Sequence, residues 1–268
     1  MLSLLDPAAR LVVAHRGNAM HAPEDTMESF RQGLALGADG LEFDVRVSAD
    51  GVPVVIHDPT LDRTTSGTGP VNARTASELR TLDAGFHFTR DGGRTFPYRG
   101  LGIRVPLLRE VLAAFPETPC IIELKTPDAT EALAQVLEEQ GAKGRVIVGS
   151  FQDAALAPLR GRGFHLGASS RETVALYMRT LLFRDGGRAA YAAACLPPRF
   201  RGLPLPLARF VHRLRPRGIP THVWTINDPA QALRLWADGV NAILSDDPGA
   251  MMSALGRPPR AIPPVESR

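Results

Sequence analysis

Cysteine and lysine are scarce in this chain of 268 residues, and both absences are informative. The two cysteines, Cys120 and Cys195, stand far apart and form no pairing pattern, which fits a reducing cytoplasm. No cluster of cysteine and histidine indicates a zinc site. Lys125 and Lys143 are the only lysines among 31 lysine and arginine residues. A lysine retained at a strand end beside a carboxylate suggests that a compact ammonium group is needed there.

Targeting signals are also lacking at the beginning of the chain. Asp6 and Pro7 come early in residues 1–13, and neither a basic region nor a long apolar run accompanies them. This pattern predicts neither a secretory signal nor a membrane span, so we expect a cytoplasmic protein. At the other end, residues 257–268 are rich in proline and predict a flexible tail after a single domain over 1–256.

Charged and histidine side chains stand at the ends of short apolar runs. These runs cover residues 11–14, 40–45, 53–57 and 120–124. The side chains in question are His15, Arg16, Glu42, Asp44, His57, Glu123 and Lys125. Two histidines, three carboxylates and two cations, all presented by strand ends, favour a metal-assisted phosphoester site.

The carboxylates carry the metal hypothesis. Glu42 and Asp44 alternate with apolar residues, so on a strand they point the same way and repel each other unless a cation intervenes. Two surface acids on a solvent-facing strand are the alternative reading. Glu123 ends another apolar strand, and a third converging acid favours a hard divalent cation, Mg²⁺ or Ca²⁺, with Mn²⁺ as a further candidate.

The histidines suit proton transfer, because an imidazole both takes and gives protons near neutral pH. His15 and His57 stand out because each ends an apolar strand and precedes a charged residue. Hydrolysis of a phosphodiester needs a base for the attacking oxygen and an acid for the leaving alkoxide. The other five histidines are interpreted as structural or surface residues.

The rest of the chain predicts an α/β fold, a slightly irregular TIM (β/α)8 barrel. The length fits one such barrel, which takes about 250 residues, and catalytic groups lie at the C-terminal strand ends. The link between Val47 and Val54 is too short for a helix, so either one βα unit is degenerate or 53–57 is not a regular barrel strand. Helices are predicted over 26–37, with Asp25 or Thr26 as its N-cap, and over 107–114, 130–140 and 229–237. Nine strands are predicted for eight places, over 11–14, 40–45, 53–57, 120–123, 145–149, 164–168, 192–196, 222–226 and 241–244.

Residues 59–105 interrupt this alternation. The segment contains a turn-rich stretch, a short helix over 75–82 and several glycines, and it is too long for an ordinary βα loop. We interpret it as a small inserted subdomain that follows the His-Asp motif. The expected place for it is over the barrel mouth, where a lid or substrate clamp would lie.

With these residues in hand, the chain resembles the glycerophosphodiester phosphodiesterase family over about residues 11–249. One departure is Asp25, where the family usually has Asn. The matching motifs are HRG at 15–17, APEDT at 22–26, LEFDV at 41–45, VVIHD at 54–58, LDRTTSGTG at 61–69, IELK at 122–125, VGSF at 148–151, HVWTIN at 222–227 and ILSDDP at 243–248.

This resemblance implies both a site and a reaction. The reaction is metal-dependent hydrolysis of a small glycerophosphodiester to glycerol 3-phosphate and an alcohol. Lysophospholipase D-type cleavage of lysophospholipids and a non-catalytic barrel that binds phosphodiesters are the alternatives. By resemblance, Glu42, Asp44 and Glu123 hold the divalent metal, His15 and His57 are the acid and base, Arg16 and Lys125 bind the phosphate, and Trp224 flanks the alcohol pocket.

The basic residues are unevenly distributed. Residues 179–217 contain many arginines and one acid, Asp185, interleaved with Leu, Phe and Pro. We favour an arginine-rich surface in an arginine-biased chain, with weak contact to an anionic membrane as the functional alternative. No known motif accompanies the charge, so nucleic-acid binding is not expected. The sequence predicts no particular oligomeric state.

Overall fold

The computed structural model describes residues 2–181, 189–200 and 202–257. Within them, a curled sheet of parallel strands runs in the order β6-β5-β4-β2-β1-β11-β10-β7. A parallel bridge between Gly167 and Ala193 joins β6 to β7, so the sheet closes on itself as a barrel. The strands are β1 (Leu11–His15), β2 (Gly40–Val47), β4 (Cys120–Leu124), β5 (Val146–Gly149), β6 (His165–Leu166), β7 (Ala194–Leu196), β10 (Thr221–Val223) and β11 (Ala242–Ser245).

The additional strand predicted over 53–57 is not a barrel strand. It forms β3 (Pro53–Val55), which pairs antiparallel with β2, with Val45 opposite Val55. The turn between them closes through the backbone of Ser48 and Val52 and leaves no room for a crossover helix. The ninth predicted strand is therefore the second strand of a hairpin with β2. The other eight strands form the predicted barrel, which is confirmed.

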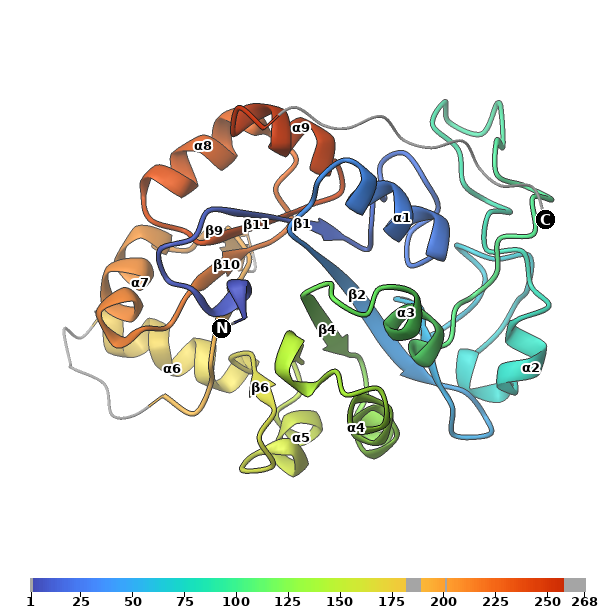
Figure 1. Ribbon diagram of the computed structural model, residues 1–268, viewed down its shortest axis with the longest axis horizontal. Coiled ribbons are helices and arrows are strands. Elements are labelled where there is room, and N and C mark those ends of the chain that lie inside the picture. The colour runs from blue at the N-terminus through green and yellow to red at the C-terminus, as the bar shows by residue number, and fades with distance from the viewer. Residues whose placement is uncertain (1, 182–188, 201, 258–268) are drawn as a thin grey trace.

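Helices surround the strands, as Figure 1 shows. The first of them begins at Thr26, whose hydroxyl accepts a hydrogen bond from the backbone N–H of Ser29, so Thr26 rather than Asp25 is the N-cap. The helices are α1 (Met27–Ala35), α2 (Ala76–Leu79), α3 (Leu108–Ala114), α4 (Thr130–Glu139), α5 (Asp153–Leu156), α6 (Ser170–Leu181), α7 (Leu207–Leu214), α8 (Pro229–Ala237) and α9 (Pro248–Ala254). Short 3-10 turns are η1 (Ser3–Leu5), η2 (Val71–Ala73), η3 (Pro127–Ala129), η4 (Lys143–Arg145), η5 (Ala157–Leu159) and η6 (Arg215–Arg217), and a small hairpin comprises β8 (Arg199–Phe200) and β9 (Leu203–Pro204).

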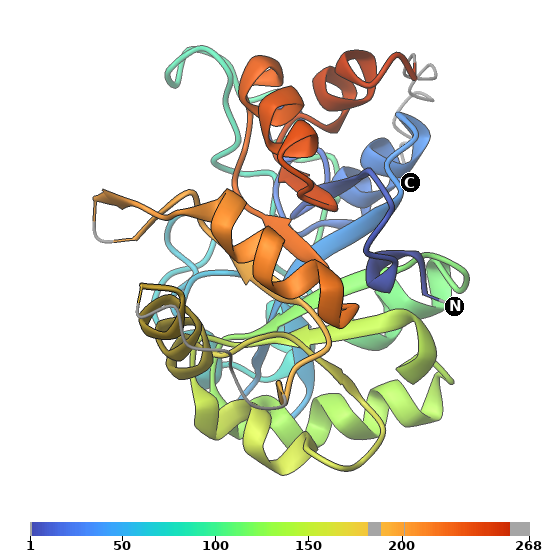
Figure 2. The ribbon, with the colours of Figure 1, turned by 90° about the vertical axis from the view of Figure 1, so that its left-hand side faces the viewer.

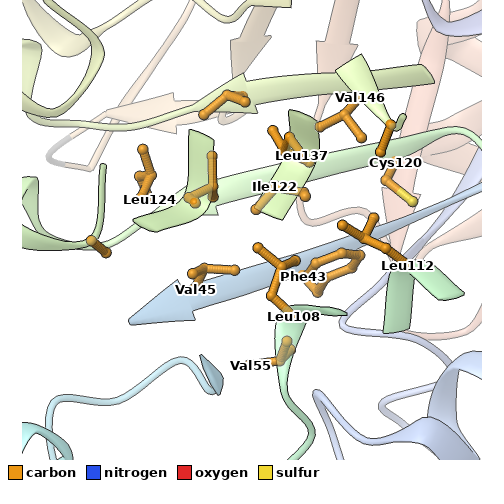
Figure 3. Close-up of a cluster of buried hydrophobic side chains, with 14 of the residues drawn as sticks. Phe43, Val45, Val55, Leu108, Leu112, Cys120, Ile122, Leu124, Leu137 and Val146 are labelled. Carbon is orange, nitrogen blue, oxygen red and sulfur yellow. The ribbon is translucent and has the colours of Figure 1, made fainter. Parts of the chain in front are cut away.

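The alternation along β2 divides its side chains between two environments. Phe43 and Val45 pack outward into the apolar layer between strands and helices, together with Ile122 of β4 and Leu108 of α3 (Figure 3). The residues between them point the other way, into the barrel. The apolar outer face fixes the orientation of the strand, because a shift of one residue would turn Phe43 and Val45 into the barrel and the carboxylates into the apolar layer.

The barrel interior is closed at its lower end by the first residues of the chain. Leu4 in η1 is fully buried against a cluster that includes Leu11, Ile121 and Leu244. The Nε2 atom of His222 donates a hydrogen bond to the carbonyl of Leu4 over 2.9 Å. A protonated Nε2 leaves Nδ1 as an acceptor, and the thiol of Cys195 lies 3.6 Å from it. His222 is therefore a neutral structural histidine.

The insertion 59–105 shares a small apolar core with β3 and the residues that flank the insertion. Val54, Leu61, Leu79 and Val105 are among the buried residues of this core. In Figure 1 the segment lies next to α1. The Tyr98 hydroxyl accepts a hydrogen bond from the Gln32 amide of α1 and donates one to the backbone carbonyl of His21. The predicted subdomain is thus present, and it lies on the side to which β1 and β2 run in Figure 1, at their C-terminal ends.

Two sequence-based expectations concern regions that are described only in part. The predicted tail lies outside the described residues except for Arg257, whose guanidinium pairs with Asp39. Residues 182–188 and 201 of the arginine-rich stretch 179–217 also lie outside them. Among the described helices, none is long and apolar enough to cross a membrane.

His222 gives a stability prediction. Burial lowers its pKa to about 4, whereas an unfolded histidine titrates near 6.5. Between these values the unfolded chain binds a proton that the folded chain does not, so folding stability falls as the pH drops from about 6.5 to about 4. The expected loss is about 3 kcal/mol, measured by urea unfolding across this range. His222→Gln removes this contribution, and an equally steep pH dependence in that variant would contradict the assignment.

Candidate active site

The C-terminal ends of the barrel strands surround a cavity of about 130 Å³. Seven of the eight site residues predicted from the sequence line it, and the eighth, Asp44, lies beneath it and contacts Lys125 and Arg16. The structure therefore brings together every predicted side chain. The cavity is lined by His15, Arg16, Glu42, His57, Ile121, Glu123, Lys125, Gly149, Ser150, Phe151, Gly167, Ala168, Cys195, Trp224, Thr225 and Leu244.

Three carboxylates form a compact group of oxygen ligands. One oxygen from each of Glu42, Asp44 and Glu123 lies within 4.8 Å of the others. The pKa of Glu42 is raised to about 7, chiefly by burial; His15 opposes this shift, and Asp44 and Glu123 contribute to it. Burial and Asp44 likewise raise the pKa of Glu123. The group suits a hard divalent cation, which would relieve this repulsion.

Two cations hold Asp44 in its ionised form. Lys125 Nζ lies 2.8 Å from its Oδ1 atom, and Arg16 Nε lies 3.1 Å from its Oδ2 atom. Burial alone would raise the pKa of Asp44, but Lys125 and Arg16 outweigh burial and lower it. Lys125 also lies 2.8 Å from Glu123, so one ammonium group bridges two carboxylates.

The backbone around Arg16 explains the His-Arg-Gly sequence. Arg16 has a φ of 52°, and its backbone N–H donates to the carbonyl of Glu42 over 2.8 Å. Gly17 has a φ of 85°, and a Cβ atom there would lie 2.5 Å from the carbonyl carbon of Ser29. Only glycine fits this close approach, which turns the chain sharply after β1 and directs the Arg16 guanidinium back to Asp44.

His15 is oriented by a carboxylate from the other end of the chain. Its Nδ1 atom donates to Asp246 Oδ1 over 2.7 Å, because a carboxylate only accepts. Asn227 donates to the second oxygen of Asp246 over 2.8 Å. The Nε2 atom of His15 lies 3.7 Å from Glu42 and 3.5 Å from the Thr225 hydroxyl. Burial would lower the pKa of His15, but Glu42 and Asp246 outweigh burial and raise it.

His57 is held in the same way by its neighbour in sequence. Its Nδ1 atom donates to Asp58 Oδ1 over 2.6 Å, and burial lowers its pKa. Arg63, from the insertion, lies 2.6 Å from the other oxygen of Asp58 and also binds Glu24. Glu24 pairs with Arg16 over 2.9 Å. A continuous chain of charged contacts therefore connects the insertion to the phosphate-binding cations predicted above.

Sequence reasoning missed the residues that orient the two histidines. Asp246 follows β11 directly, so the rule that strand ends carry function could have found it. Three further residues, Asn227, Glu24 and Arg63, lie within the motifs quoted above. They stand in loops or turns, so the periodic patterns of strands and helices do not single them out.

Aromatic side chains form one wall of the cavity. The rings of Trp224 and Phe151 meet edge to face, with 5.7 Å between their centroids. Phe151 follows β5 and is 51% exposed, although it lines the cavity. The predicted position of Trp224 beside the site is thus observed, and Phe151 adds a second apolar surface there.

Asp25 occupies an unusual position beside the carboxylates. It has a φ of 57° and is buried, and its Oδ1 atom accepts a long contact of 3.4 Å from the backbone N–H of Asp44. Its Oδ2 atom has no hydrogen-bond partner among the described residues. Burial and the nearby Asp44 raise the pKa of Asp25 well above its usual value.

Comparison with known proteins shows the family of the chain and agrees with the fold. A model of the glycerophosphoryl diester phosphodiesterase family matches residues 15–250. The chain belongs to this family. A glycerophosphodiester phosphodiesterase of Caldanaerobacter subterraneus subsp. tengcongensis is 32% identical over 250 residues, which are 91% of this chain and 96% of that protein. The resemblance inferred from the motifs is thereby confirmed.

Solved structures of the glycerophosphoryl diester phosphodiesterase family share the fold. One is the glycerophosphoryl diester phosphodiesterase domain of an uncharacterized Mycobacterium tuberculosis protein, with a TM-score of 0.79, 28% identity, and coverage of 93% of this chain and 99% of that one. Another is an Oleispira antarctica phosphodiesterase in complex with the product sn-glycerol-3-phosphate. It has a TM-score of 0.74 and 26% identity, and covers 92% of this chain and 97% of that one.

Asp25 gives a second stability prediction. Asn keeps the shape and tolerates a positive φ, but it carries no charge to bury. In buffer with chelator, Asp25→Asn should raise the thermal midpoint. The gain should grow as the pH rises from about 4, because the ionised carboxylate then destabilises only the native protein. Asp128→Asn, which removes one exposed charge, should show no such growth, and an identical response of the two variants would contradict the analysis.

Proposed function

We propose that this protein hydrolyses small glycerophosphodiesters to glycerol 3-phosphate and an alcohol, in a reaction that depends on a divalent cation. The observation that carries the proposal is that two histidines, two cations and the carboxylate group converge on one cavity. The relatives named as glycerophosphodiester phosphodiesterases support the substrate class. A non-catalytic barrel is disfavoured, because neither histidine and no acid of the predicted set is missing.

Glu42, Asp44 and Glu123 would hold the cation. Their donor set fits it, because hard divalent ions prefer carboxylate oxygens and the three acids already lie within 4.8 Å. When bound, such a cation polarises a non-bridging phosphate oxygen and lowers the pKa of an attacking hydroxyl. Lys125 would keep Asp44 and Glu123 in place and offer its remaining N–H groups to the phosphate.

The two histidines would act as the acid and the base. In each ring Nδ1 donates to a carboxylate, Asp246 for His15 and Asp58 for His57, so Nε2 is the atom left for proton exchange. One imidazole takes the proton of the attacking hydroxyl, and the other protonates the leaving alkoxide. Arg16 lines the cavity beside them and would share the negative charge of the phosphate.

The cation requirement gives a third prediction. Activity toward glycerophosphocholine should disappear in chelator and return with Mg²⁺, Ca²⁺ or Mn²⁺. Glu123→Gln should weaken Mn²⁺ binding, measured by direct titration. Loss of a residue that only supports a ligand costs roughly 10- to 100-fold in affinity, so loss of a direct ligand should cost at least as much. The exposed acid Glu139 provides a matched control, and Glu139→Gln should bind Mn²⁺ like the parent. Full activity in chelator would refute the proposed cation dependence.

The unit of His15 and Asp246 gives a fourth prediction. His15→Ala should lower kcat/KM by on the order of 10²-fold or more, and Asp246→Asn should also lower it, because the imidazole loses its fixed orientation. The double variant should be little worse than His15→Ala, since the two residues act as one unit.

The neighbouring Asp247 supplies the control for Asp246. Its Oδ1 atom accepts from the backbone N–H of Ala250 and caps α9. Asn caps helices as well as Asp does, so Asp247→Asn should leave both thermal stability and kcat nearly unchanged. Equal rate losses in Asp246→Asn and Asp247→Asn would argue against an orienting role for Asp246, and multiplying losses in the double variant would argue against a single unit.

A further inference from the structure

The structure holds the two histidines of the site to different degrees. The side chain of His15 is 11% exposed, whereas that of His57 is 33% exposed, so packing restrains the His57 ring less. Arg46 Nε donates to the backbone carbonyl of His57 over 2.8 Å, which fixes the backbone there but does not restrain the ring. The direction of the ring therefore depends on the hydrogen bond from Nδ1 to Asp58, and on what holds that carboxylate.

Arg63 holds the Asp58 carboxylate at both oxygens. Its Nε atom lies 2.6 Å from Oδ2, and its Nη2 atom lies 3.0 Å from Oδ1. The other edge of the same guanidinium binds Glu24, with Nη1 2.6 Å from Oε2 and Nη2 2.7 Å from Oε1. A planar guanidinium carries its N–H groups in a fixed fork, so one arginine can hold two carboxylates at a fixed angle. The hydrogen bonds from Arg63 also hold the pKa of Asp58 well below its usual range, so Asp58 stays an ionised acceptor.

The sequence around Arg63 folds into a turn that the core of the insertion anchors. The backbone N–H and the hydroxyl of Thr65 both donate to the carbonyl of Leu61, over 3.1 and 2.9 Å. Leu61 is fully buried in the apolar core shared with β3, and its own N–H donates to the carbonyl of Gly69 over 2.9 Å. The backbone of Arg63 is therefore held from within the insertion, although its side chain is 49% exposed.

Glu24 extends the contacts of Arg63 to the side of the cavity where Arg16 lies. Its Oε1 atom accepts from Arg16 Nη1 over 2.9 Å, so Arg63 and Arg16 share one carboxylate. Arg16 in turn contacts Asp44. From Asp58 to Asp44 the charges alternate in sign, and each guanidinium lies between two carboxylates. Loss of Arg63 would divide this series in two and release Asp58 from it.

We propose that Arg63 is a positioning residue for the reaction: it fixes Asp58 and thereby directs the Nε2 atom of His57 toward a phosphate bound beside Arg16. This inference rests on the proposed function. Arg63 does not touch the reacting atoms, and its effect passes through Asp58. With Asp58 fixed, Nδ1 keeps its hydrogen and Nε2 exchanges the proton with the reacting oxygen. Without Arg63 the imidazole can turn or carry its hydrogen on Nε2 instead, and the proton exchange slows.

Substitutions at Arg63 test this role with glycerophosphocholine as the substrate. Arg63→Ala should lower kcat by up to about 10²-fold, the cost of a misplacement of about 1 Å, while KM should change much less because Arg16 keeps its contact with Asp44. Arg63→Lys should retain part of the rate, because an ammonium group can reach one carboxylate but has no fork. N-ethylguanidinium replaces the atoms that Arg63→Ala removes, and the half-exposed site admits it, so adding it should restore part of kcat. Combining Asp58→Asn with Arg63→Ala should cost little more than Asp58→Asn alone, since the two residues act as one unit.

Arg80 provides the matched control. It also belongs to the insertion, its side chain is 43% exposed, and it pairs over 2.7 Å with a carboxylate outside the insertion, that of Glu110. Arg80→Ala therefore removes a comparable contact between the insertion and the barrel without touching Asp58. It should leave kcat at the parent value, with or without N-ethylguanidinium. Equal losses of kcat in the two variants, or a loss in Arg63→Ala that N-ethylguanidinium leaves unchanged, would overturn the proposal.

Nuclear magnetic resonance of the histidine rings supplies a readout that needs no turnover. At a pH of about 8, above the usual imidazole pKa, the parent's His57 should carry its hydrogen on Nδ1, and His57→Gln identifies its signals. Arg63→Ala should shift this ring toward a mixture of the two tautomers, whereas Arg80→Ala should match the parent. An unchanged tautomer in Arg63→Ala overturns the positioning of His57, even where the parent cleaves glycerophosphocholine and the proposed function stands. A changed tautomer supports the positioning, and if the parent then cleaves no diester, it is the proposed function that fails.

Discussion

The burial of Asp44 beside two other carboxylates is the constraint on which the rest of the site depends. Asp44 is 1% exposed. Burying an ion costs several kcal/mol, and one opposite charge at about 4 Å offsets about 4 kcal/mol at an effective dielectric constant near 20. One cation would therefore barely balance the cost, and the repulsion of Glu42 and Glu123 adds to it. Both Lys125 and Arg16 are needed to keep Asp44 ionised in the protein, before any metal is considered.

This requirement extends through the structure by way of Arg16. Its guanidinium also pairs with Glu24, which binds Arg63 of the insertion, and Arg63 in turn holds Asp58. The insertion thus reaches the catalytic region through one arginine, while its apolar residues pack with Val54 of β3. We infer that it supports the orientation of His57, which makes it an integral part of the single domain proposed for 1–256 rather than an ornament.

The sequence predicted those features that follow from local periodicity. Glu42 and Asp44 were found because a strand alternates its faces and ends at the barrel mouth. Asp246 was not, because it comes from the far end of the chain and its role depends on closure of the barrel beside β1. Asp25 was interpreted as a possible helix cap, but its burial and positive φ arise from neighbours supplied by other segments. The strand predicted over 53–57 is observed at Pro53–Val55, and its antiparallel pairing with β2 decides between the two predicted alternatives by placing it outside the barrel.

The arginine-rich stretch shows how one segment can carry two kinds of pattern. In α7, Phe210 and its apolar neighbours are buried in the core and Arg209 is exposed, which is the ordinary pattern of an amphipathic barrel helix. This favours the reading of α7 as a solvated basic face. In the β8–β9 hairpin the pattern differs, because Leu203 is exposed and lines a cavity that shares residues with the proposed active site. Because the hairpin, which projects from the barrel in Figure 2, lies outside the barrel sheet, substitutions there can alter this cavity and leave the carboxylates in place. The apolar cavity beside the hairpin and the charged cluster at the strand ends therefore rest on separate parts of the fold.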